Sequence, residues 1–498
     1  MFADLLNETE ILETRGDLGV EVTGIATDSR TVAPGEIFVA VPGQHVDGRA
    51  FIAQAVEAGA AGIVCEPPGP SGLPVPVVLV PDANRAIAEL AGAFYGHPSR
   101  NLGLVGVTGT DGKTTTTHLI AAILNAAGVR TGMISTVAMN VGNGEVRNRT
   151  SHTTPQATVI QRSMAQMRAT GASVVALEVS SHALALGRVV GCSFDCAVFT
   201  NLAPEHLDFH GTIDNYRASK AILFSQLDQS SGKRWGKLGV VNRDDASATA
   251  MQAATKAACL GFGMTPEADV WAEPIRSTLH STAFRVHAPF GVATLETRLA
   301  GRHNVYNWLG AIAAAHHFGA SLDDAVRAAG EFRGVPGRLE ELRCGQPFEV
   351  FVDFAHTPQA LATTLDLLRS QKKGRLIVLF GQAGGRDLGN RRRMASAVAE
   401  RADLAILTSD DPYDEDPQSI VDDLAATMVG HGWSENKRFW RIVERRAAIA
   451  FALNLARRDD CVLLAGRGPE EHTVIRGEKI PLVDADVARE VLGRQTAA

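Results

Sequence analysis

Apolar positions in this 498-residue chain follow two alternating patterns. Short apolar runs of the kind that buried parallel strands need, such as LGLVGV at 102–107 and RLIVLF at 375–380, precede stretches with helical spacing. Such alternation is typical of α/β folds. The pattern therefore predicts an α/β protein built on parallel sheets, with one antiparallel, more weakly patterned stretch near 268–300.

The length and the changes of pattern divide the chain into three predicted domains. Residues 1–99 are expected to form a small N-terminal α/β domain. Residues 100–334 are expected to form a central P-loop-type parallel-sheet ATPase domain. Residues 335–498 are expected to form a Rossmann-like C-terminal α/β domain, in which four strands end in glycine-rich or acidic turns. Strand ends of this kind predict one ligand-binding edge.

Composition narrows the classes of function. The net charge of −7 gives no reason to expect nucleic acid or an anionic membrane as a partner. The chain has no apolar run of about 18 residues, and its N-terminus is acidic, so we expect a cytoplasmic protein. Six scattered cysteines without a C-x-x-C pair are expected to be free thiols rather than a metal site.

The most informative stretch is LGLVGVTGTDGKTTTT at 102–117. An apolar strand leads into a glycine turn, then into Lys113 and Thr114 and a helical segment. Glycines let backbone N–H groups approach phosphate oxygens, the lysine supplies positive charge, and the hydroxyl can ligate Mg²⁺. The strict phosphate-loop spacing would place its first glycine at Val107, whereas the glycines stand at Gly106 and Gly109. The context still predicts ATP and Mg²⁺ binding.

Other polar positions leave alternatives open. Glu178 ends an apolar strand and is either a Mg²⁺ or water-orienting group or a solvated acid. A dense polar loop from Glu205 to His210 is either a site or a helix cap. The spacing of apolar residues alone predicts that Lys220 is an exposed lysine. Two broad interpretations survive, an ATP-using enzyme and a P-loop switch or motor. The strand segment VVALEVSSH has Glu178 as its single acid, followed by hydroxyls, which favours small-molecule chemistry.

The motifs GTDGKTT, HTTPQA, EVSSHALALGR, EHLDFHG, GRHNVYN, PGRLE, VDFAHTPQAL and GQAGGRD, in this order, resemble the Mur ligases, and most of all the branch that adds the third amino acid of the peptide. The resemblance implies that ATP phosphorylates the terminal carboxylate of UDP-MurNAc-L-Ala-D-Glu. The amino group of an amino acid then attacks the acyl phosphate. We expect a monomer that acts on small molecules. The resemblance implies that it uses ATP, Mg²⁺ and CO₂, the last bound as a lysine carbamate.

The resemblance also implies roles for individual residues. ATP is expected at Gly109, Thr110, Asp111, Gly112, Lys113, Thr114, Thr115, Asn304, Arg338 and Asp353. Metal ligands are expected to be Thr114, Glu178, His206 and Lys220 as its carbamate, with Lys113, Glu178, His206 and Lys220 in catalysis. The UDP-MurNAc-dipeptide is expected at Ser29, Gln44, His45, Val46, Thr153, Thr154, Ser180 and Arg188. The amino acid is expected at Arg386, Asp410, Asp411, Pro412, Tyr413, Gly466 and Glu470.

The amino-acid site departs from the pattern of ligases that add meso-diaminopimelate. Those enzymes carry D-N-P-R and G-K-G-H-E, whereas this chain has DDPY at 410–413 and GRGPE at 466–470. An acid-rich pocket should prefer a side-chain ammonium. We therefore expect L-lysine or L-ornithine, with meso-diaminopimelate as the alternative. An amidotransferase-coupled Mur-like ligase and a nucleotide-binding scaffold remain further alternatives.

Overall fold

The computed structural model describes residues 1–43, 46–150, 152–229, 232–385 and 388–497. The chain forms two compact units. The first unit contains residues 1–274, 284–295 and 303–331, and the second contains 275–283, 296–302 and 332–498. The three domain ranges expected from the sequence stay a prediction, because compactness alone does not separate the first two.

The N-terminal part of the first unit is a five-stranded sheet in the order β1-β5-β4-β3-β2. All neighbours are parallel except the edge pair of β1 and β5. Its strands are β1 Glu13–Arg15, β2 Gly24–Ala26, β3 Glu36–Ala40, β4 Gly62–Cys65 and β5 Val77–Leu79. The accompanying helices are α1 Phe2–Leu5, η1 Gly48–Phe51, α2 Ile52–Glu57, α3 Ala83–Phe94 and η2 Pro98–Arg100.

An eleven-stranded sheet follows, in the order β16-β15-β14-β13-β12-β11-β6-β10-β7-β8-β9. Its strands are β6 Gly103–Thr108, β7 Thr131–Ile134, β8 Ala138–Asn140, β9 Glu145–Arg147, β10 Val174–Glu178, β11 Cys196–Phe199, β12 Leu238–Asn242, β13 Ala258–Gly263, β14 Val270–Ser277, β15 Thr282–Ala288 and β16 Gly291–Thr297. Strands β7, β10, β6, β11, β12 and β13 run parallel to their neighbours in this series, so their carboxyl ends share one edge.

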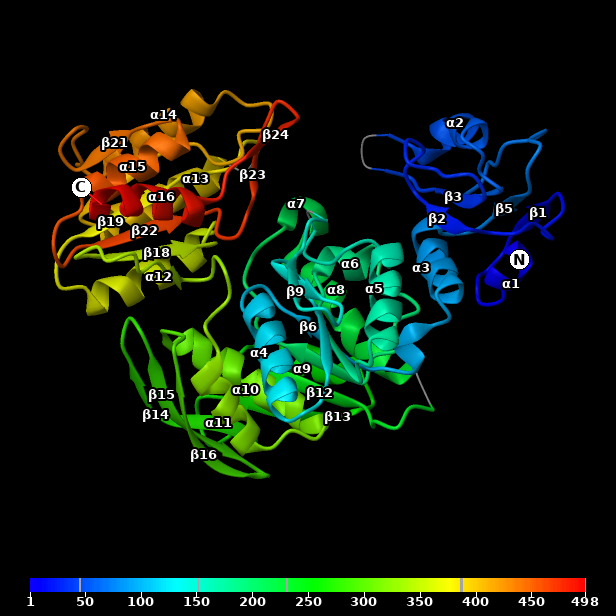
Figure 1. Ribbon diagram of the computed structural model, residues 1–498, viewed down its shortest axis with the longest axis horizontal. Helices are drawn as coiled ribbons and strands as arrows, with labels where there is room; N and C mark the ends of the chain where they lie inside the picture. Colours follow the sequence, from blue (N-terminus) through cyan, green and yellow to red (C-terminus); the bar gives the residue numbers. More distant parts are fainter. Residues whose placement is uncertain (44–45, 151, 230–231, 386–387, 498) are drawn as a thin grey trace. The chain divides into compact units, whose positions relative to one another are not determined.

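Helices lie around this sheet, and α4, after β6, packs against β7 and β10 (Figure 1). The helices are α4 Lys113–Ala126, α5 Ala157–Ala169, α6 Ser181–Ala185, α7 Leu207–His210, α8 Ile213–Ser225, η3 Gln226–Gln229, α9 Ala248–Ala253, α10 Arg302–His317 and α11 Leu322–Glu331. Apolar side chains of α5 and α8 share a core with β10 and β11. The sheet is therefore covered by helices, as its nearly continuous apolar strands require.

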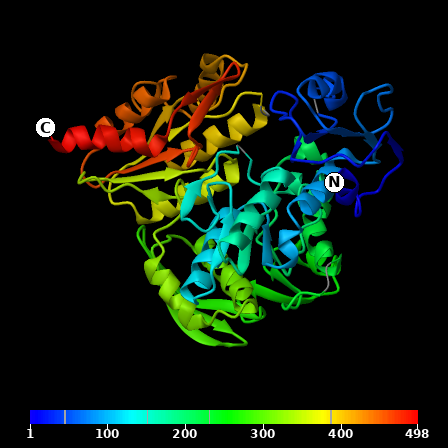
Figure 2. The ribbon, with the colours of Figure 1, turned by 45° about the vertical axis from the view of Figure 1, so that its right-hand side comes forward.

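The second unit is a six-stranded sheet in the order β17-β18-β22-β19-β20-β21, parallel except at β17. Helices α12, α13 and α14 share one core with this sheet, and α15 and α16 share the other (Figures 1 and 2). The elements are β17 Glu340–Glu341, β18 Glu349–Asp353, α12 Pro358–Gln371, β19 Leu376–Phe380, α13 Leu388–Arg401, β20 Leu404–Leu407, α14 Pro417–Gly430, β21 Phe439–Arg441, α15 Arg445–Leu455, β22 Cys461–Ala465, β23 His472–Ile475, β24 Glu478–Pro481 and α16 Asp484–Ala497.

The expected α/β fold class is confirmed, including the strand, turn and helix around Lys113. The six cysteines, all within the described residues, form no disulfide bonds. Within the described residues, no helix has both the length and the apolar character needed to span a membrane.

Candidate active site

The glycine turn between β6 and α4 has the backbone conformation that a phosphate loop needs. All of β6 is buried, so the turn begins at a fixed point of the sheet. Gly109 and Gly112 have φ values of +151° and +82°, which side chains rarely adopt. A Cβ atom on Gly112 would lie 2.3 Å from Oδ1 of Asn307. The helix N-terminus at Lys113 adds positive potential beside the turn.

Two lysines converge on one carbonyl oxygen of this loop. Nζ of Lys113 donates to the oxygens of Gly109 and Thr110, at 3.1 and 2.6 Å. Nζ of Lys220 donates to the Gly109 oxygen at 2.6 Å and lies 4.1 Å from the centre of the Tyr216 ring. Lys220 is 1% exposed, so the exposed-lysine alternative is wrong. Burial, and then the charge of Lys113, hold the pKa of Lys220 well below its ordinary value, which favours the neutral amine.

Glu178 lies behind the loop at the end of β10. It is 1% exposed, which excludes the solvated-acid alternative. One carboxylate oxygen accepts a hydrogen bond from Oγ1 of Thr114 at 3.0 Å, and the other accepts from the N–H of Thr136 at 2.7 Å. Hydroxyl and carboxylate oxygens are ligands that suit Mg²⁺, so the donor set of Thr114 and Glu178 fits this ion.

Neutral imidazoles form the next part of the site. His206 precedes α7 as its N-cap residue with a φ of +55°, and its ring centre lies 4.7 Å from that of His182. Burial lowers the pKa of His206, and burial together with the two neighbouring histidines lowers the pKa of His182 to about 4. Nε2 of His210 lies 3.0 Å from Oγ of Ser181. Uncharged ring nitrogens can accept a hydrogen bond or ligate a metal.

Some of these groups, among them Lys113, His206 and Lys220, line a cavity of about 250 Å³ in the first unit. Three predicted catalytic residues line it together with three predicted peptide contacts. Its lining comprises Gly109, Lys113, His152, Thr153, Ser180, Ser181, His182, Arg188, His206, Tyr216 and Lys220. The sequence prediction assigned no role to His182 or Tyr216, although His182 lies inside the motif EVSSHALALGR. A larger cavity of about 590 Å³, in the second unit, contains none of the predicted residues.

Thr154 and Arg188 reinforce the peptide side of this cavity. Oγ1 of Thr154 donates to the backbone oxygen of Glu178 at 2.9 Å and accepts the N–H of Ser180 at 2.9 Å. Nη1 of Arg188 donates to the Thr154 oxygen at 3.0 Å. These bonds fix Arg188 and Ser180 in the cavity that Lys113 also lines, which is an arrangement suited to an anionic substrate.

Only two of the four residues expected to bind the uridine nucleotide, Ser29 and Val46, lie within the described residues. Oγ of Ser29 donates to Oε1 of Gln54 at 2.9 Å, and the Val46 side chain is 55% exposed. Gln44 and His45 lie outside the described residues, as does Arg386 of the expected amino-acid site. The uridine site therefore stays a prediction.

The expected ATP contacts beyond the loop fall in different units. Asn304, in the first unit, accepts a hydrogen bond from Asn307 at 2.9 Å. Asp353 ends β18 in the second unit and accepts the N–H groups of Leu339 and Ala355 at 2.6 and 3.0 Å. The guanidinium of Arg338 lies 4.4 Å from the centre of the Phe354 ring. Their roles toward ATP stay predictions.

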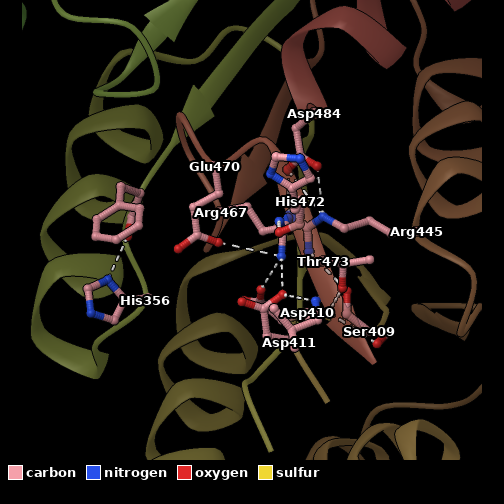
Figure 3. A network of polar contacts seen from close by, with 12 residues as sticks. His356, Ser409, Asp410, Asp411, Arg445, Arg467, Glu470, His472, Thr473 and Asp484 are labelled. Carbon is pink, nitrogen blue, oxygen red and sulfur yellow. Dashed lines mark hydrogen bonds and ion pairs between the residues drawn. The ribbon is translucent and has the colours of Figure 1, made fainter. Parts of the chain in front are cut away.

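The acids expected to bind the amino acid already have a cation (Figure 3). Asp410 and Asp411 follow β20, and Nη1 of Arg467, after β22, lies 3.0 and 2.8 Å from their carboxylate oxygens. The same nitrogen lies 3.5 Å from Glu470. The expectation of L-lysine or L-ornithine rested on the excess of acids in this pocket. Arg467 neutralises part of that negative charge.

The turn that follows these acids is held by the C-terminal hairpin. The N–H of Tyr413, after Pro412, donates to the oxygen of Val474 at 3.0 Å. Tyr413 has a φ of +52° and remains 40% exposed. Gly466 has a φ of +108°, and a Cβ atom there would lie 3.1 Å from Oδ2 of Asp410. The two loops therefore approach each other closely around the acid cluster.

Comparison with known families accounts for most of the chain. Residues 21–95 match the description "Mur ligase family, catalytic domain", residues 107–315 match "Mur ligase middle domain", and residues 337–468 match "Mur ligase, glutamate ligase domain". The three matches follow one another in chain order and leave only short stretches between them.

Two similar sequences carry functional names. The UDP-N-acetylmuramoyl-L-alanyl-D-glutamate--2,6-diaminopimelate ligase of Geobacillus kaustophilus is 43% identical over 469 residues, which cover 94% of each chain. The UDP-N-acetylmuramyl-tripeptide synthetase of a Roseiflexus species is 41% identical over 481 residues, covering 95% of this chain and 94% of that one.

Solved structures of similar proteins carry names of the same family. One UDP-N-acetylmuramoyl-L-alanyl-D-glutamate--2,6-diaminopimelate ligase is 31% identical, with a TM-score of 0.64 and coverage of 95% of both chains. The MurF ligase of Thermotoga maritima, in complex with ADP, is 18% identical with a TM-score of 0.63, and it covers 97% of this chain and 100% of that one. The second likeness concerns the fold alone.

Proposed function

The chain belongs to the Mur ligase family of ATP-dependent amide ligases, and we propose that it adds 2,6-diaminopimelate as the third amino acid to UDP-MurNAc-L-Ala-D-Glu. The named relatives favour this alternative over L-lysine or L-ornithine. The observation that carries the proposal for the reaction is the 250 Å³ cavity, which is lined by Gly109 and Lys113 of the phosphate loop together with Arg188, Thr153 and Ser180.

The first step transfers the γ-phosphoryl group of ATP to the carboxylate. A carboxylate oxygen of the D-glutamyl residue forms a bond to the γ-phosphorus, the bond to the bridging oxygen breaks, and ADP leaves. A carboxylate is a poor electrophile, and the resulting acyl phosphate is a good one. In the second step the amine attacks the carbonyl carbon, phosphate leaves with its bonding electron pair, and the nitrogen loses a proton to give the amide.

Both steps bring anions together, and the cavity supplies cations and donors for them. Lys113 is proposed to leave the loop carbonyls and bind phosphate oxygens. Arg188 is proposed to hold the anionic peptide, with Thr153 and Ser180 donating hydrogen bonds beside it. Their shared position around one cavity supports these roles.

Thr114 and Glu178 are proposed to hold Mg²⁺, with His206 close by. When bound, the ion would supply positive charge that offsets the charge of the phosphates. The buried, neutral amine of Lys220 is proposed to combine with CO₂. A bond forms between Nζ and the carbon, and a proton is released, so that a neutral group becomes an anionic carbamate able to ligate a metal.

The test is the release of ADP and phosphate by the purified protein. Release is expected only when UDP-MurNAc-L-Ala-D-Glu and an amino acid are both present, with 2,6-diaminopimelate used faster than L-lysine or L-ornithine. Release with ATP alone would contradict the ligase reaction, whereas a preference for L-lysine would contradict only the choice of amino acid. We also propose that the reaction takes place in the cytoplasm, where ATP is available.

The amidotransferase-coupled ligase and the nucleotide-binding scaffold have less support. A scaffold would have no need for Lys113, Glu178, His206 and Lys220 together, and the relatives that match nearly the full chain are named as ligases. The expected monomer stays a prediction, and gel filtration of the purified protein would test it.

A further inference from the structure

Three carboxylates of the second unit converge within a few ångströms. Asp410, Asp411 and Glu470 each offer an oxygen, and these oxygens lie within 4.8 Å of one another. Like charges at this separation repel strongly when they are screened from water. Burial, and then the charge of Asp410, raise the pKa of Glu470 to about 7. The cluster therefore needs a cation at its centre.

Arg467 is that cation. Its side chain is fully buried, and Nη1 contacts all three acids, at 3.0, 2.8 and 3.5 Å. Nη2 donates to the backbone oxygen of His472 at 2.5 Å, which fixes the plane of the guanidinium (Figure 3). Nη1 therefore lies where an exogenous ammonium would have to lie to contact all three acids.

The Asp411 carboxylate and the Asp410 backbone are also held by contacts that do not involve Arg467. The N–H of Val474 donates to Oδ1 of Asp411 at 2.9 Å, and Oγ1 of Thr473 donates to the backbone oxygen of Asp410 at 2.7 Å. Removal of the guanidinium would therefore leave the Asp411 carboxylate directed at the space that Nη1 occupied.

We propose that Arg467 is a specificity-determining residue of the amino-acid site, which sets the charge that an incoming side chain must carry. This inference rests on the proposed function. The end of the 2,6-diaminopimelate side chain carries both an ammonium and a carboxylate, whereas the L-lysine side chain ends in an ammonium alone. With Arg467 present, the cluster tolerates the carboxylate and gains little from a second cation.

The test compares kcat/KM for 2,6-diaminopimelate, L-lysine and L-ornithine in variants of the full chain. Arg467→Met removes the charge and keeps a long side chain, so the ratio of L-lysine to 2,6-diaminopimelate should rise roughly tenfold or more. Arg467→Lys keeps the charge and is the matched control, with a ratio expected within about twofold of wild type. An unchanged ratio in a folded Arg467→Met enzyme would overturn the inference.

Asp411→Asn tests the same inference by removing a negative charge from the cluster instead of the positive charge. The amide oxygen can still accept from Val474 and Arg467, but one negative charge is lost, so the ratio should fall. Melting curves would reveal whether Arg467→Met folds. If it does not, Asp411→Asn becomes the test, and an unchanged or higher ratio of L-lysine to 2,6-diaminopimelate in that variant overturns the inference. A wild-type protein that used none of the three amino acids would refute the proposed function itself, and the inference with it.

Discussion

Replacement of Lys220 by alanine should abolish turnover while leaving the protein folded. The buried Nζ donates to the Gly109 oxygen at 2.6 Å and faces the Tyr216 ring. Lys220→Ala removes the amine and leaves a cavity beside the phosphate loop. Lys220→Met removes the same amine but fills most of the space, so it is the matched control.

The structure gives the expected size of each effect. Truncation of a buried side chain to alanine costs about 2–5 kcal/mol of the free energy of unfolding, whereas a swap that conserves volume costs less than about 1.5 kcal/mol. Because burial lowers the pKa of Lys220, the unfolded chain binds a proton here that the folded protein does not. Wild-type stability should therefore rise with pH up to the ordinary pKa of lysine, and both variants should show a flatter dependence. Turnover should fall about 10²–10³-fold in both.

The assay is ADP release in the complete reaction, with and without acetate or formate. A small carboxylic acid can enter the cavity of Lys220→Ala and replace the carbamate, so partial rescue is expected there and not in Lys220→Met. NMR spectra after addition of ¹³C-labelled bicarbonate should contain a carbamate signal for wild type alone. Near-normal turnover of Lys220→Ala, or equal rescue of both variants, would refute the carbamate assignment.

Three further predictions concern stability and the phosphate loop. Gly112→Ala should raise the KM for ATP and lower the melting temperature more than Gly128→Ala, because both glycines have positive φ but only Gly112 lacks space for a Cβ atom; equal effects would contradict this. Asp195→Asn removes the buried partner of Lys233 and should cost about 3–5 kcal/mol in denaturant unfolding, whereas a cost under about 1 kcal/mol would refute the pairing. Burial raises the pKa of Glu470 to about 7, so the folded protein holds this proton more tightly than the unfolded chain. As the pH rises from 4.5 to 7, the melting temperature of wild type should therefore fall more than that of Glu470→Gln. The difference should be small, because the Glu470 side chain is 39% exposed and solvent screens its charge. A parallel pH dependence of the two proteins would argue against it.

The strands that the sequence predicted well are those with unbroken apolar runs. β6, β10, β19 and β22 are buried along their whole length, so their residues carry the pattern that identifies them. The edge strand β1 was missed, because its three residues, ETR, are exposed or partly exposed and polar. Hairpin strands such as β24, which is exposed throughout, give no periodic signal either.

Site residues were predictable where a motif fixes local geometry. The loop glycines, Lys113 and Glu178 have their positions set by the strands that precede them, and the structure places them together. Spacing could not reveal the burial of Lys220, because α8 has little amphipathic pattern and its neighbours are supplied by distant segments. The same limit applies to Arg467, whose two aspartate partners lie 56 and 57 residues away.

The shared carbonyl of Gly109 bears on the proposal that Lys220 forms a carbamate. Lys113 and Lys220 both donate to that oxygen, and two ammonium groups so close together would repel each other. The conflict is removed if Lys220 is neutral, since a neutral amine can still donate one hydrogen bond. A neutral buried amine is also the form that reacts with CO₂. The position beside Lys113 therefore suits a lysine that is neutral and can be converted into an anionic carbamate, as we propose for Lys220.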